Sequence, residues 1–118
     1  MSIWTGNRFE KKEDLPPEGT YDSILKAVIP WKAKGPRSLI FLFGFEHQGK
    51  EYRAGKLMDA LHYDYGFFEL TMKLLGHPPR LGAQVKASEL LGQPLRIDVV
   101  HDRSEQLRCF FLKVDKWA

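Results

Sequence analysis

Apolar and polar residues alternate with a period of two along several short stretches of this chain, a pattern typical of β-strands. The pattern predicts strands over 20–29, 38–46, 50–58, 95–100 and 107–114. In the second of these, one face carries Leu39, Phe41, Phe43 and Phe45, and the other carries Ile40, Leu42 and Gly44. We expect the phenylalanines to fill a core, which leaves the other face as a smooth apolar surface for bases or a partner.

Turn residues separate these stretches. His47-Gln48-Gly49 predicts a tight hairpin between the second and third strands. The segment 30–37, with two prolines and a glycine, predicts an irregular loop between the first and second. His101–Gln106 predicts a polar turn between the last two strands, and the polar, proline-containing segment 1–19 predicts an extended N-terminal arm.

One segment has helical instead of strand periodicity. Phe67–Leu75 carries an apolar stripe at helical spacing, and Gly76 followed by Pro78 predicts its end. A second, short helical turn is expected to begin at Ser88. The resulting order is three strands, a helix and two strands, which is the order of the OB-fold, a small five-stranded barrel. The fold class predicted is therefore all-β with one helix between strands three and four; an open α+β sheet is the alternative.

Composition limits the class of protein. The 118 residues suffice for one domain, and we expect an N-terminal arm over 1–19 followed by a barrel over 20–118. The composition, with 43% hydrophobic and 28% charged residues, is ordinary for a globular protein. A single cysteine, Cys109, excludes an internal disulfide. The longest apolar run, 39–45, is too short to span a membrane, and the N-terminus does not resemble a signal peptide. We therefore expect a cytoplasmic protein.

Charge is distributed unevenly. The formal net charge is only +3, but residues 21–58 carry seven basic and three acidic side chains. A basic excess concentrated in one third of the chain, among aromatic residues, is typical of a nucleic-acid-binding surface.

Several motifs resemble a family of small phage and mobile-element proteins. The matching segments are PPEGTY at 16–21, the strand and hairpin over 38–49, the helix over 67–76, and ASELLGQPL at 87–95. The resemblance covers about residues 15–117. It implies an OB-fold and single-stranded DNA binding in replication or recombination. The chain ends DKWA, without the acidic tail by which many such proteins recruit partners.

OB-folds bind ligands on the face of strands two and three and with the loops joining strands one to two and four to five. Single-strand binding needs cations for phosphates and flat rings for bases. These requirements predict a binding surface made of Trp31, Lys32, Lys34, Arg37, Lys50, Tyr52, Arg53, Lys56 and Arg103.

Other kinds of site find little support. The four histidines stand apart from one another and from Cys109, so no metal site is predicted. No phosphate-binding loop or nucleophile–base pair is evident, so we expect neither an enzyme nor a cofactor. The expected partner is single-stranded DNA, with RNA, a second copy of the chain, or a replication or recombination protein as further candidates. The rival function is a protein-interaction module that uses the apolar face of the second strand.

Overall fold

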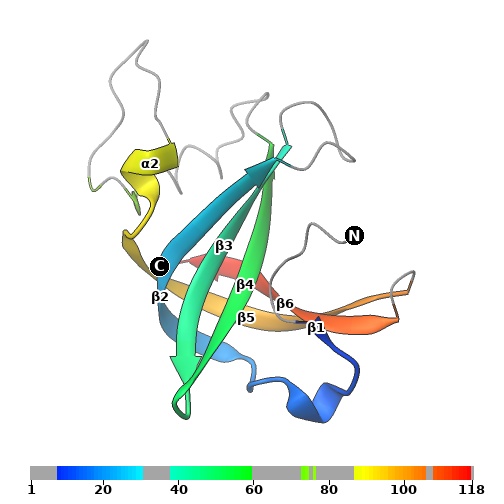
Figure 1. Ribbon diagram of the computed structural model, residues 1–118. Helices are drawn as coiled ribbons and strands as arrows, with labels where there is room; N and C mark the ends of the chain where they lie inside the picture. The colour runs from blue at the N-terminus through cyan, green and yellow to red at the C-terminus, as the bar shows by residue number, and fades with distance from the viewer. Residues whose placement is uncertain are drawn as a thin grey trace.

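The computed structural model describes residues 8–30, 38–59, 73–74, 76, 87–105 and 108–117. Strands dominate this part of the chain (Figure 1). The elements, in chain order, are β1 (Arg8–Phe9), the 3-10 turn η1 (Lys12–Asp14), β2 (Gly19–Pro30), β3 (Ser38–His47), β4 (Lys50–Asp59), α2 (Ala87–Leu90), β5 (Pro94–Ser104) and β6 (Cys109–Trp117).

Five of the strands close into a barrel. β2 pairs with β3, β3 with β4, β4 with β6, β6 with β5, and β5 with β2, so that the ring has no open edge. All of these pairings are antiparallel except β4–β6, which is parallel. In Figure 1, β2, β3 and β4 rise side by side while β5 and β6 cross them at a steep angle. The two-residue β1 adds to the edge of β6. The predicted β-barrel is therefore confirmed, and the structure goes no further than this toward a fold family.

The bounds of β2, β3 and β4 agree with the sequence pattern to within one residue, whereas β5 and β6 are displaced from the predicted 95–100 and 107–114. Gln48 and Gly49 both adopt a positive φ, which is the backbone that a two-residue type I′ hairpin turn requires. The expected short helical turn is present as α2, and Gly92 follows it with a positive φ. Of the helix expected over 67–75, only Lys73 and Leu74 lie within the described residues, and the loop expected over 30–37 is described only at Pro30. The helix between the third and fourth barrel strands is therefore not shown.

The barrel interior is filled by side chains from every strand of the ring. Phe41 and Phe43 are fully buried, and Phe45 nearly so, as the alternation predicted. The same cluster includes Leu25, Ile97, Val99, Leu112 and Val114. Leu74, the second of the two helical residues, also packs there.

The opposite face of β3 differs from its prediction. Ile40 and Leu42 point away from the core cluster, yet they are 1% and 0% exposed. Gly44, on the same face, has the stem of Lys26 lying over it, because a Cβ added there would meet two Lys26 carbons at 2.9 Å. The expectation of a smooth, open apolar face on this strand is wrong. A strand buried on both faces has a near-continuous apolar sequence, and 39–45 is such a run.

A bulge in β2 explains how Lys26 reaches this position. The register between β2 and β3 shifts between Leu25 and Ala27, so Lys26 has no direct partner on β3. The shift also reverses the alternation of β2, so that Val28 packs against the core as Leu25 does.

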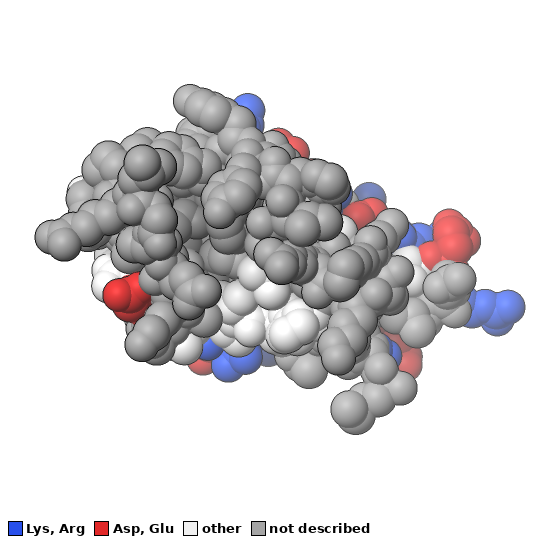
Figure 2. Space-filling view, turned by 90° about the horizontal axis from the view of Figure 1, so that it is seen from above, with Lys and Arg blue, Asp and Glu red and all other residues white. Residues whose placement is uncertain are grey.

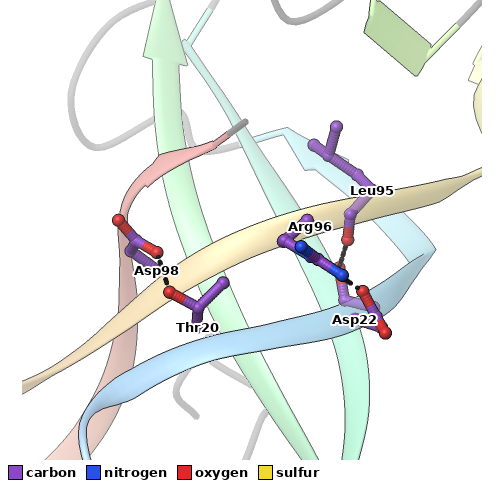
Figure 3. A network of polar contacts seen from close by, with 6 residues as sticks. Thr20, Asp22, Leu95, Arg96 and Asp98 are labelled. Atoms are coloured by element: carbon purple, nitrogen blue, oxygen red, sulfur yellow. Dashed lines mark hydrogen bonds and ion pairs between the residues drawn. The ribbon is translucent and has the colours of Figure 1, made fainter.

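Polar contacts fix the register of β2 against β5 (Figure 3). Thr20 donates a hydrogen bond to Asp98 at 2.6 Å, and Arg96 donates one to Asp22 at 3.1 Å. Both pairs are exposed, so each contributes little to stability. The buried Ser23 hydroxyl donates to the Leu95 carbonyl at 2.6 Å, and this bond is shielded from water.

Candidate nucleic-acid interface

The predicted site residues fall into two groups. Trp31, Lys32, Lys34 and Arg37 lie outside the described residues, so the structure does not describe this loop. The other five come from β4 and β5: Lys50 and Arg103 are exposed, Arg53 and Lys56 are half-buried, and Tyr52 is buried.

Tyr52 is a core residue. Its side chain is 8% exposed, and its ring lies within about 6 Å of the rings of Phe9 and Phe45, centroid to centroid. The exposed Lys50 extends its ammonium group over the same ring, 5.4 Å from the centroid. Tyr52 alternates with the outward residues of β4, and burial leaves it no surface on which a base could stack. It is therefore removed from the candidate site.

Lys56 helps to close the barrel. A register shift between Asp98 and Val99 leaves Asp115 of β6 outside the β5–β6 pairing. The Lys56 ammonium group donates a hydrogen bond to the carbonyl of Asp115 at 3.2 Å and lies 5.6 Å from the Trp117 ring centroid. Since β4 and β6 share a single pair of residues in register, this side chain strengthens the weakest seam of the ring.

Arg103 lies in a strand and not in the polar turn where the sequence placed it. β5 continues to Ser104, because residues 101–104 pair with 109–112 of β6. The guanidinium group lies over the ring of Phe110 at 5.7 Å, and one of its nitrogens is 3.9 Å from the carboxylate of Glu105. Arg103 remains exposed, near the end of a hairpin that extends beyond the barrel (Figure 1).

A group of residues on the outer face of this hairpin was not predicted from the sequence. β1 pairs with β6 so that Arg8 stands directly beside Phe111, and Lys113 follows two residues later on the same face. Phe110 and Leu112 point to the other side, into or against the core. Both cations are exposed and Phe111 is half-buried. Nothing in the sequence of 1–19 indicates that it adds a strand.

Three contacts hold the segment between η1 and β2 against the barrel. The Tyr21 hydroxyl donates to the Pro17 carbonyl at 2.5 Å, and the ring nitrogen Nε2 of His101 lies 2.6 Å from the Pro16 carbonyl. Since a carbonyl only accepts, Nε2 must carry the proton. The backbone N–H of His101 donates to the Glu18 carboxylate at 2.8 Å. Together these contacts fix the path of the arm that supplies Arg8.

The same packing changes the ionisation of Tyr21. Burial of the phenol against Phe45, whose ring centroid is 4.4 Å away, raises the pKa of Tyr21 above its ordinary value. The phenol of Tyr52 contributes a smaller electrostatic effect in the same direction.

Charged side chains of both signs occur toward the hairpin side of the molecule. Figure 2 shows blue and red groups close together on the right, the side on which the hairpin projects in Figure 1. Around the hairpin and β1 the cations include Arg8, Arg103, Arg108 and Lys113, and the anions include Glu10, Asp102, Glu105 and Asp115. Two of these anions have local partners. Asp102 accepts from the backbone of Arg103 at 2.8 Å, and Glu105 is the partner of the Arg103 side chain.

Within the described residues, no three His, Cys, Asp or Glu side chains come close enough together to hold a metal ion. In the same part of the chain, no helix is long and apolar enough to cross a bilayer. Comparison with known proteins adds no relative: no family model, no curated protein and no solved structure matches this chain.

Proposed function

We propose that this protein binds single-stranded DNA, largely without sequence preference, on the surface of an OB-type barrel. The observation that carries the proposal is the closure of the ring. The first barrel strand, β2, pairs with both the second and the fourth, while the third meets the fifth in parallel. This arrangement of strands supports an OB-type barrel, an architecture that commonly holds oligonucleotides.

The chemistry of the surface supports a nucleic-acid ligand. Single-strand binding combines cations that follow the phosphates with rings on which bases stack. β1 and the β5–β6 hairpin supply exposed cations for the phosphates, namely Arg8, Arg103 and Lys113. Trp31 and the three cations that follow it remain part of the proposal as a sequence-based expectation.

The rival proposal, a protein-interaction module in a phage or mobile-element replication complex, has weaker support. It relied on an open apolar face on β3, and that face is buried. The large hydrophobic residues that are exposed in the described part of the chain are Ile24, Leu57 and Leu91, which come from separate elements. No observation on this part of the chain favours a protein partner over a nucleic acid.

Intrinsic tryptophan fluorescence tests the proposal. Titration with an oligothymidine should quench the emission, and the affinity should fall as salt rises, with a log–log slope of about −0.7 per phosphate contacted. A duplex of equal length should bind more weakly, and an oligouridine arm compares RNA. A Trp31→Phe variant separates stacking on Trp31 from signals of the other two tryptophans. Absence of any binding at low micromolar protein and low salt would refute the proposal.

A further inference from the structure

A segment formed by residues 8–18, here called the strap, closes one end of the barrel. It comprises β1, η1 and the residues that lead into β2, and it is the dark-blue segment below β5 and β6 in Figure 1. Phe9 and Leu15 anchor the strap, since they are 7% and 8% exposed and belong to the core cluster. All five residues between these anchors are charged and exposed. The strap therefore covers the end of the barrel with its apolar side chains.

Three aromatic rings lie together at this end of the barrel. The ring centroid of Tyr52 is 6.1 Å from that of Phe9 in the strap and 5.9 Å from that of Phe45. Tyr21 completes the group, with its ring centroid 4.4 Å from that of Phe45 and its hydroxyl bonded to the Pro17 carbonyl of the strap. While the strap is in place, Tyr52 has almost no surface of its own, and Phe9 occupies the position beside it.

The charges around these rings differ between the barrel and the strap. The exposed Lys50 places its ammonium group 5.4 Å from the centroid of the Tyr52 ring. Glu46 and Glu51, the neighbouring pair on the same hairpin, alternate with Phe45 and Tyr52 and so lie on the other face of the sheet. The strap carries three cations and four carboxylates, so its closure adds no net positive charge at this end.

The strap is attached separately from the strands that close the barrel. Among the described strands, the pairings of the closed ring join β2 to β6, whereas β1 pairs with β6 through two residues only. The turn η1 has no side-chain hydrogen bond at its N-cap, and two of the three polar contacts of residues 16–18 are exposed. A segment held by so few buried contacts opens at a lower free energy than the strands of the core. The strap can therefore leave while the ring of strands stays closed.

We infer that the strap is an autoinhibitory element, and that a base of single-stranded DNA takes the place of Phe9 beside Tyr52 when the strap opens. The inference rests on the proposed function and adds to it a stacking site that the closed strap occupies. The distance between the rings of Phe9 and Tyr52 is within the range of aromatic pairs, which a stacked base also adopts. Lys50 stays exposed beside Tyr52 and is placed to meet the phosphate next to that base.

Anisotropy of a labelled oligothymidine, measured with the whole chain, tests the strap in two ways. Phe9→Ala/Leu15→Ala removes both anchors and raises the fraction of open strap, so it should tighten binding about five-fold or more. The matched control, Lys12→Ala/Glu13→Ala, changes two exposed residues of the same strap at constant net charge and should bind like the unaltered protein. Thermal unfolding of each variant shows whether the barrel is intact.

A reversible disulfide tests the strap without weakening its anchors. Arg8 and Phe111 are direct partners on β1 and β6, so their Cα atoms lie about 4.5–5.5 Å apart, within the range that a disulfide spans. The variant is Arg8→Cys/Phe111→Cys, with Cys109→Ala to remove the native thiol. The oxidised form holds the strap closed and should bind about ten-fold more weakly than the same protein after reduction.

The outcomes separate the strap from the proposed function. Tighter binding by the anchor variant, together with weaker binding by the oxidised form, supports the inference. If the unaltered protein binds and oxidation leaves the affinity unchanged, the inference is wrong while the proposed function stands, and this comparison decides alone where the anchor variant fails to fold. An intact anchor variant that binds no more tightly than its control also overturns the inference. If neither the unaltered protein nor the reduced disulfide variant nor the anchor variant binds, both proposals fail.

Discussion

The burial of Leu42 on the outside of the barrel leads to a quantitative prediction. Leu42 is 0% exposed and stands between Ala27 of β2 and Gly55 of β4, two residues too small to fill the space its side chain would leave. Leu57 lies on the same outer face of the neighbouring strand but is 41% exposed. We expect truncation to alanine to be far more costly at Leu42 than at Leu57.

The size of the difference follows from the two burials. Removing about three buried carbons costs about 2.4 kcal/mol in transfer free energy at Leu42, and a cavity that cannot collapse adds about 1 kcal/mol. At Leu57 the transfer cost falls with exposure to roughly 1.4 kcal/mol, and water fills the space. The expected difference in unfolding free energy is therefore about 2 kcal/mol.

Urea unfolding followed by far-ultraviolet circular dichroism measures both variants against the unaltered protein. Melting temperatures provide a second readout, since about 1 kcal/mol corresponds to about 4 °C in a domain of this size. Leu42→Ala should melt about 8 °C below Leu57→Ala. Equal losses near 1 kcal/mol for both variants would refute the argument, because they would mean that the outer face of β3 is as open as that of β4.

Three further predictions follow from individual contacts. Ser23→Ala removes the buried hydrogen bond between β2 and β5 and should lower the unfolding free energy, measured in urea, by about 1–2 kcal/mol. Arg96→Ala breaks an exposed ion pair and should lower it by less than about 1 kcal/mol. Equal losses would contradict the burial of the Ser23 hydrogen bond. Because burial raises the pKa of Tyr21 in the folded state, the unfolded chain loses this phenolic proton at lower pH than the folded protein does. The stability that Tyr21 contributes is therefore complete below about pH 10 and falls as pH rises toward the folded pKa. Tyr21→Phe should make this fall shallower, and an unchanged pH profile of stability would contradict the argument. Arg108→Gly relieves a positive φ, so it should change the unfolding free energy by less than about 1 kcal/mol. Because it also removes a cation, it should weaken oligothymidine binding. A large loss of stability would show that the Arg108 side chain has a structural role.

Much of the barrel could be predicted from local patterns. Alternation placed the strands, and His47-Gln48-Gly49 predicted a hairpin turn, which the positive φ values of Gln48 and Gly49 confirm. The phenylalanines at 41, 43 and 45 were correctly assigned to the core. The strands, the hairpin turn and the inward phenylalanines depend on residues that are neighbours in the sequence, so the alternation of apolar and polar residues predicts them.

The errors arose where distant segments meet. The bulge at Lys26 shifts the register of β2, and its consequence, a side chain lying over Gly44, depends on a neighbouring strand. β5 extends through Arg103 because β6 continues to pair with it, although 101–106 is polar enough to predict a turn. Tyr52 was placed on a ligand surface since alternation alone does not say which of two faces is the inner one.

The candidate site was harder to predict than the fold. Arg8 and Phe111 are far apart in sequence, and only the pairing of β1 with β6 brings them side by side. Lys56 was chosen for its charge, but the carbonyl that it contacts becomes available only through a register shift in another strand. Charge and residue type indicated a class of ligand, whereas position on the barrel depends on tertiary pairing.

The most direct test of single-strand binding is a titration of the ¹⁵N-labelled protein with unlabelled oligothymidine, followed through backbone amide chemical shifts. The account predicts saturable shifts that weaken as salt is added. A spectrum that does not change at oligonucleotide concentrations well above that of the protein would contradict it.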